Sequence, residues 1–208
     1  MKTLIVIIVS FICSTTSFAQ SKYEKGMEKG LALFKEQKIN EASNVFERIA
    51  STEQDNWIPY YYEAYVNVIA SFGEKDETAI TNKLKIAEKS LLKAAKISPN
   101  NPEIMVLQAL QKTAWIAFDG ATYAMQYAPE ITALYQKANT IAPNNPRVVY
   151  SLAEWNMGSA RYFGKDITPF CGDLEQALKL FATFKNDTAF YPSWGEDRTK
   201  QLLTDCKK

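Results

Sequence analysis

The sequence predicts an all-α fold, an α-solenoid in which antiparallel helix pairs follow one another along the chain. The first observation is a turn motif that occurs twice. Ser-Pro-Asn-Asn-Pro-Glu at residues 98–103 returns as Ala-Pro-Asn-Asn-Pro-Arg at residues 142–147, 44 residues later. In each copy the first proline ends a helix because it lacks an N–H, and the second fits the first turn of the next helix. The motifs therefore mark boundaries between repeated units.

The second observation is a spacing of apolar residues along the helix before each boundary. An apolar residue, a large one four positions later and another apolar one three positions after that recur four times, at offsets of 45, 44 and 46 residues. The four copies are Ala42, Phe46 and Ile49; Ala87, Leu91 and Ala94, followed by Pro99; Ile131, Tyr135 and Ala138, followed by Pro143; and Ala177, Phe181 and Phe184. Steps of four and three place these side chains on one buried helix face.

This small, large, small and proline pattern resembles the second helix of a tetratricopeptide (TPR) repeat over residues 23–184. Gly30, twelve residues before Ala42, matches the family's usual interval in the first unit. The resemblance implies a right-handed TPR-like superhelix whose concave groove binds extended peptides or helices of partner proteins. The chain departs from the family because its later units carry about ten extra residues between their helices, and because the tryptophan, leucine and tyrosine signature of the first helix is poor.

Each unit is expected to hold two helices joined by a connection of polar or small residues. The predicted units are residues 23–56, 57–101, 102–145 and 146–192, with helices at 23–36 and 40–51, 58–72 and 78–97, 102–118 and 129–141, and 146–163 and 173–185. The connections are 37–39, the polar 73–77, the small and aromatic 119–128, and 164–172. A capping helix within 193–206 begins with a capping-box pattern, Ser193 to Glu196, and covers the last unit.

The first nineteen residues have the features of a cleaved export signal. Lys2 precedes an apolar run over residues 4–12, and Ser-Phe-Ala at 17–19 provides a small-residue boundary. Ile12 stands where a lipoprotein signal needs a small residue before Cys13, so lipid anchoring is not expected. The prediction is one domain, residues 20–208, that is periplasmic or secreted and has no stable membrane insertion after cleavage.

Composition and motifs argue against several function classes. Without the signal, Lys and Arg balance Asp and Glu at 23 each, which favours neither nucleic acid nor an anionic membrane as partner. The sequence has no histidine, which is the commonest general base at neutral pH and the commonest zinc ligand. It also lacks a phosphate-binding glycine loop, a nucleophile elbow and a calcium loop. We therefore expect no catalytic activity, no cofactor and no metal site.

Two cysteines, Cys171 and Cys206, follow the predicted signal. Export to an oxidising compartment allows a disulfide between them, and the alternative is two unpaired thiols. If the last helix runs antiparallel to the helix that begins near Asp173, Cys206 lies beside Cys171. This layout favours the bridge.

Function is expected in the concave groove. Two binding hypotheses are open, and a third function class is an enzyme that relies on acidic residues alone. The leading hypothesis is a protein-binding scaffold or adaptor whose partner segment contacts an inner stripe of the first helix of each unit. The predicted contacts are Tyr61, Tyr65 and Val68; Val106, Leu110 and Thr113; and Arg147, Tyr150, Glu154, Met157 and Arg161. The alternative is a small-ligand or glycan carrier that uses the aromatic residues Trp57, Tyr61, Tyr65, Trp115 and Tyr123. The lengthened helices and the 119–128 connection could instead fill the groove, because apolar stripes at helical period are more often core than site.

A short modification motif stands before the last helix. Asn186-Asp187-Thr188 is a formal N-glycosylation sequon, and Asp187-Thr188-Ala189 is similar to an O-glycosylation signal of some secreted bacterial proteins. Both motifs are short, so glycosylation is left open. The oligomeric state is not predicted.

Overall fold

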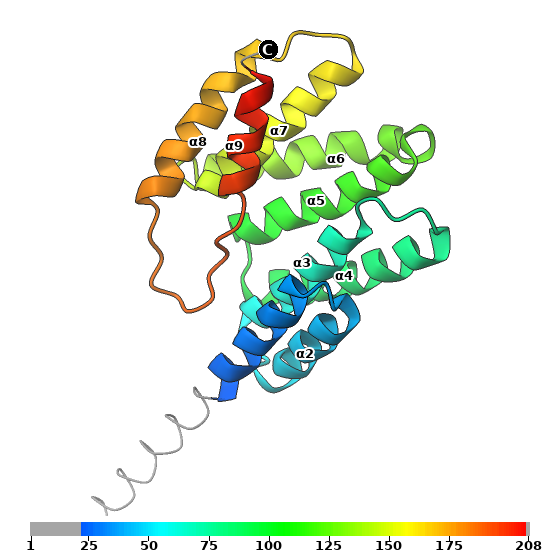
Figure 1. Cartoon of the computed structure of the whole chain (residues 1–208), viewed down its shortest axis with the longest axis vertical. Coiled ribbons are helices and arrows are strands. Elements are labelled where there is room, and N and C mark those ends of the chain that lie inside the picture. The colour runs from blue at the N-terminus through cyan, green and yellow to red at the C-terminus, as the bar shows by residue number, and fades with distance from the viewer. Residues whose placement is uncertain (1–21, 207–208) are drawn as a thin grey trace, which may run out of the picture.

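In the computed structural model, residues 22–206 are described, and their regular secondary structure is helical, with no strand. The first described helix covers residues 22–35. The others are α2 (Ile39–Thr52), α3 (Trp57–Ser71), α4 (Glu77–Ile97), α5 (Pro102–Phe118), α6 (Gly120–Ile141), α7 (Pro146–Tyr162), a 3-10 turn (Thr168–Phe170), α8 (Cys171–Thr183) and α9 (Glu196–Asp205) (Figure 1). The all-α prediction is confirmed. The predicted export signal, residues 1–19, lies outside the described residues.

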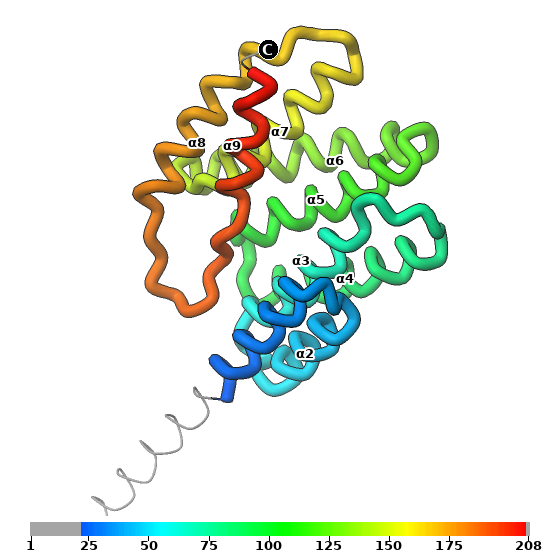
Figure 2. Tube along the Cα trace, viewed as in Figure 1, coloured from blue at the N-terminus to red at the C-terminus, as the bar shows by residue number. Residues whose placement is uncertain are grey.

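The helices pack in chain order. Each of α2 to α8 contacts the next helix, and α3, α5 and α7 also contact one another in sequence, so these three form a continuous layer. Figure 2 shows the hairpins following one another along the long axis, with the segment after α8 turning back toward the first helices. In residues 22–206 no helix has the length and apolar character needed to cross a membrane.

The two boundary motifs form equivalent turns. The side chain of Asn101 accepts a hydrogen bond from the backbone N–H of Glu103 at 2.9 Å, and Asn145 accepts one from Arg147 at 3.0 Å. Each asparagine thus satisfies one of the free N–H groups at the start of a helix, and Pro102 or Pro146 occupies its first turn. The repeated motif therefore forms the same capped turn in both places.

The motifs' last residues form a buried ion pair between α5 and α7. Arg147 donates from Nε and Nη2 to the two carboxylate oxygens of Glu103, each at 2.8 Å, and Asn145 donates to the same carboxylate at 2.6 Å. Arg147 is 1% exposed and Glu103 is fully buried. A bidentate pair with a further donor is the geometry that a buried charge needs, and it fixes the register between the two units.

The core runs along the molecule as three clusters. The first joins the 22–35 helix to α5, the second lies among α5, α6 and α7, and the third lies among α7, α8 and α9. Close helix contact in the first cluster depends on Gly30, where an added Cβ would lie 2.6 Å from the ring of Phe46. This accounts for the glycine at that position of the first unit.

The starts of two helices differ from the prediction for reasons that their caps explain. α6 begins at Gly120 rather than 129, because the Asp119 side chain accepts the N–H of Thr122 at 3.1 Å and caps the helix there, leaving Pro129 inside it. α9 begins at Glu196, and its N-cap is Gly195 at φ 110° with no side-chain cap, so the predicted capping box does not form. A Cβ at Gly195 would lie 2.8 Å from Tyr150, which explains why glycine fits there.

Candidate functional site

Much of the predicted contact stripe is core. Tyr61, Val68, Val106 and Met157 are fully buried, and Arg147 is engaged by Glu103. These side chains are packed in the core clusters or paired with Glu103, so they present no surface to a bound partner. The apolar stripe at helical period marks helix packing here, which was the alternative expectation for such a pattern.

The groove beside α3 is filled by the chain itself. The 184–195 segment, which connects α8 to α9, places Trp194 against the aromatic residues of α3. The Trp194 Nε1 donates to the Tyr61 hydroxyl at 2.8 Å, and its ring stacks on Tyr65 with centroids 5.3 Å apart. Tyr191 of the same segment lies edge-on to Trp57 at 5.9 Å. Three of the five aromatic residues proposed for stacking on a ligand are therefore engaged internally.

Arg147 also anchors this segment. Its guanidinium lies 5.0 Å from the ring centre of Phe184 and 5.5 Å from that of Tyr191, both in cation–π range. Burial raises the pKa of the Tyr191 hydroxyl, which also lies near the Glu103 carboxylate. The 184–195 segment has no helical periodicity, so no sequence pattern assigned it to the groove.

A large cavity remains farther along the layer. It has a volume of about 1120 Å³ and lies among α5, α6 and α7, with side chains of the 184–195 segment and α9 at one end. Its lining residues are Ile69 and Phe72; Leu110, Thr113, Ile116 and Ala117; Gly120, Ala124, Met125, Ala128, Pro129 and Tyr135; Tyr150, Ser151, Glu154, Trp155, Gly158, Ser159, Tyr162 and Phe163; and Trp194 and Arg198. Most of them are apolar, so the cavity suits an apolar ligand.

The cavity brings together four predicted contact residues: Leu110, Thr113, Tyr150 and Glu154. The other seven lie elsewhere. Tyr65 is half-buried under Trp194, and Arg161 forms an ion pair with Asp205 at 2.9 Å. Trp115 and Tyr123, the remaining aromatic residues of the alternative set, contact each other at 4.9 Å and do not line the cavity.

Small residues make the room in this cavity. A Cβ built at Gly120 or Gly158 would meet no atom within 4 Å, so both glycines face open space. Large apolar side chains stand at the margin instead: Met125 is 92% exposed, Tyr162 80% and Phe163 67%. Clustered exposure of this kind is typical of a binding site.

The polar groups of the wall are few. Burial raises the pKa of the Tyr135 and Tyr150 hydroxyls, so both stay protonated at neutral pH and can donate hydrogen bonds. Among the lining residues of the described chain, Glu154 and Arg198 are the two that carry charge, and they pair at 2.7 Å between Nη2 and Oε1. Within residues 22–206 there is no group of three or more His, Cys, Asp or Glu that could hold a metal ion.

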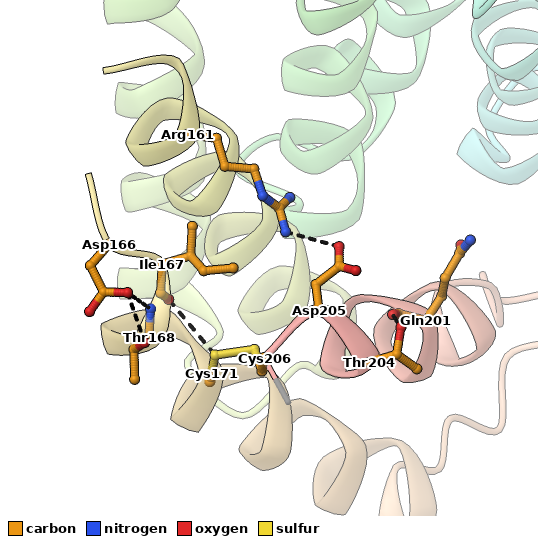
Figure 3. The surroundings of a disulfide bond; sticks show 9 residues. All are labelled: Arg161, Asp166, Ile167, Thr168, Cys171, Gln201, Thr204, Asp205 and Cys206. Carbon is orange, nitrogen blue, oxygen red and sulfur yellow. Dashed lines mark hydrogen bonds and ion pairs between the residues drawn. A yellow bond between two sulfur atoms is a disulfide. The ribbon is translucent and has the colours of Figure 1, made fainter. Parts of the chain in front are cut away.

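A disulfide fixes the end of α9. Cys171, the first residue of α8, is joined to Cys206, just after α9, and beside it Arg161 reaches Asp205 (Figure 3). These links connect α9 to α8 and α7 at its C-terminal end. They hold in place the helix that carries Arg198.

Comparison with solved structures gives an informative match, whereas the sequence comparisons do not. No protein-family model and no curated protein sequence matches the chain. Among solved structures, the HusA haemophore from Porphyromonas gingivalis superposes with a TM-score of 0.77 at 26% identity, over 89% of this chain and 92% of that one. The likeness is to a helical binding protein rather than an enzyme, and it favours the small-ligand alternative over the protein scaffold. The chain is thus similar in fold, over most of its length, to a haemophore.

Proposed function

We propose that this chain is an exported small-ligand-binding protein that holds haem or a related planar apolar molecule in the cavity among α5, α6 and α7. The observation that carries the proposal is the cavity itself. Its volume of about 1120 Å³ is slightly above the roughly 300–1,000 Å³ of typical small-ligand sites. The structural likeness to a haemophore supports haem as the first ligand to test.

The lining explains why a planar apolar ligand suits this site. Ala117, Ala124 and Gly158 leave space between the helices, and the exposed ring of Tyr162 offers a flat face at the margin. With no histidine in the sequence, Met125 and Tyr162 are the exposed lining residues of the kinds that can ligate haem iron. Burial of the ring would supply most of the binding free energy.

Filling the cavity with a larger side chain tests whether the ligand binds there. Gly158→Phe places a ring in open space on the cavity wall, so we expect haemin and metal-free protoporphyrin to lose at least about tenfold in affinity, as when a ligand's buried volume is removed. Quenching of tryptophan fluorescence reports binding, because Trp155 and Trp194 line the cavity.

The matched control is Gly172→Phe, since a Cβ there also meets open space but Gly172 lies on α8, away from the cavity. It should bind like the wild type. Equal affinity of both variants for the ligand would contradict the cavity assignment, and a wild type that binds neither compound would contradict the choice of ligand.

Export and repeat architecture belong to the same proposal. Packing of α3 on α4, of α5 on α6 and of α7 on α8 supports four TPR-like units, residues 23–56, 57–101, 102–145 and 146–192, with α9 as the closing helix. A disulfide in the structure is consistent with an oxidising compartment, periplasmic or extracellular. N-terminal sequencing of the exported protein should begin at Gln20, and a retained leader would contradict cleavage.

A protein partner is the second candidate function. It is favoured by the exposed apolar side chains of Met125, Tyr162 and Phe163 at the cavity margin. If a partner docks there, Phe163→Ser should weaken its capture in a pull-down from the organism's envelope fraction. Unchanged capture would place the partner elsewhere.

A further inference from the structure

The cavity wall contains one ion pair in otherwise uncharged surroundings. Glu154 comes from α7 and Arg198 from α9. Arg198 donates from Nε to Glu154 Oε1 at 2.8 Å and from Nη1 to Gln201 at 2.9 Å, while its Nη2 lies 2.7 Å from the same Glu154 oxygen. A charged side chain in an apolar ligand site usually fixes the orientation of the ligand.

From this arrangement we infer that Arg198 binds a carboxylate of the ligand and makes the site selective for planar acids over their neutral analogues. The inference rests on the proposed function and names the ligand class: an apolar body with an acidic group at one end. The apolar part lies against Leu110 and Ile116, and the acid points toward α9.

The hydrogen bonds leave Arg198 able to take such a group. A guanidinium has five N–H donors, and the contacts with Glu154 and Gln201 use Nε, one N–H of Nη2 and one of Nη1. One N–H on each terminal nitrogen is left over. The Arg198 side chain is 48% exposed, so these donors can be reached from the cavity. A carboxylate is the anion that a planar Arg fork matches best.

Glu154 competes with the ligand carboxylate for Arg198. Its side chain is 29% exposed and that of Arg198 48%, and ion pairs at this exposure contribute little to stability. A ligand carboxylate can therefore share or replace the Glu154 contact at small cost. The negative charge of Glu154 repels an incoming acid, whereas the positive charge of Arg198 attracts it. The two side chains therefore have opposite effects on the affinity for an acid.

The position of Arg198 depends on α9. The Cys171–Cys206 disulfide and the Arg161–Asp205 ion pair hold the C-terminal end of this helix, and Gly195, which Tyr150 crowds, begins it. Arg198 is thus carried on an element whose two ends are both fixed. The contacts that fix α9 therefore also fix Arg198, the residue that selects the acid.

The test compares protoporphyrin with its dimethyl ester, which differ only in the acid groups. Arg198→Gln should weaken binding of the diacid by about tenfold, the loss typical of a charge-assisted hydrogen bond, and leave the diester unchanged. Glu154→Gln should strengthen binding of the diacid by a few fold and leave the diester unchanged.

Arg161→Gln is the matched control, because Arg161 also joins α7 to α9 through an ion pair yet does not line the cavity. It should not distinguish the two porphyrins. Equal loss of acid and ester in Arg198→Gln, or no loss of either, would overturn the inference while leaving the cavity proposal in place. A wild type that binds neither porphyrin would overturn both proposals.

Discussion

Glu63 is a carboxylate placed inside the helix layer. It is 7% exposed on α3, and its Oε2 accepts a hydrogen bond from the Ser90 hydroxyl at 2.7 Å. Burial raises the pKa of the Glu63 carboxyl above its usual value, although the Ser90 hydrogen bond partly opposes this. When the folded pKa lies above the unfolded one, folding favours the protonated form. The ionised carboxylate therefore costs stability as pH rises from the unfolded pKa through the folded one.

A neutral replacement should remove this cost. Glu63→Gln keeps an oxygen that can accept from Ser90, and we expect the free energy of unfolding at pH 7 to rise by about 1 kcal/mol, the scale of a poorly compensated buried polar group. Near pH 3.5 the wild type is itself protonated at Glu63, so the gain should vanish. Urea unfolding followed by circular dichroism at both pH values measures this. Glu88→Gln on the exposed face of α4 is the control, and a lower stability of Glu63→Gln at pH 7 would contradict the argument.

At the residue scale, the sequence predicts most of the core, and part of the predicted contact stripe is buried in that core. Nine of the twelve repeated apolar positions are at most 3% exposed: Ala42, Phe46, Ala87, Leu91, Ala94, Ile131, Tyr135, Ala138 and Ala177. The other three, Ile49, Phe181 and Phe184, are half-buried. Tyr61 and Val68 of the predicted contact stripe are buried. Because α3 has a single charged residue, Glu63, hydrophobicity does not separate its packed face from a ligand face. Only the tertiary contacts distinguish the two.

At the element scale, α9 continues the register of the repeat. Glu154 pairs with Arg198 and Arg161 with Asp205, each pair 44 residues apart, the same separation as Glu103 and Arg147. α9 also packs on α8 as α7 packs on α6. The proposed TPR-like arrangement predicts this packing, because α9 would then take the place of the first helix of another unit and cover the last apolar face.

The cavity comes from the parts of the chain that depart from the repeat. Residues 120–129 extend α6 beyond its predicted start, and they supply Gly120, Ala124 and Met125 to the wall. Spacing alone indicated extra residues between the helices but not their structure, because Gly120 and Pro129 oppose a helix locally. Packing of α6 along α5 outweighs that preference. The site could not be predicted because insertions carry no repeat signal.

The disulfide should govern the stability of α9. Replacing Cys171 and Cys206 with serine removes the covalent closure of the segment between them, and the chain-entropy model gives a loss of roughly 3–4 kcal/mol for a loop of this size. Hydrogen exchange should accelerate most in α9, the helix that the bridge ties to α8. Intact mass should show the wild type about 2 Da below its reduced form, consistent with one S–S bond. Equal exchange of α9 in both proteins, or equal mass before and after reduction, would contradict this role.

At the scale of the whole molecule, the 184–195 segment joins the two ends of the array. Phe190 lies edge-on to Tyr23 of the first described helix at 5.6 Å, and Trp194 reaches Tyr61, 133 residues away, through a hydrogen bond. In a simple helical array each unit contacts only its neighbours, so units can unfold one after another. Here the segment before α9 packs on the first described helix and on α3. The three core clusters should therefore unfold together.

Removing the contacts of Trp194 should allow the three core clusters to unfold separately. Trp194→Ala deletes the hydrogen bond to Tyr61 and the stacking on Tyr65, and we expect a loss of about 3 kcal/mol, as for other large aromatic truncations, with the single thermal transition broadening or dividing. Differential scanning calorimetry tests this, because the ratio of calorimetric to van't Hoff enthalpy should rise above one in the variant only. Trp155→Ala is the matched control, since Trp155 bonds locally to Thr132 and its loss should lower the midpoint without changing that ratio. A variant at Trp194 that still unfolds with a ratio of one would show that contacts between adjacent units suffice for cooperativity.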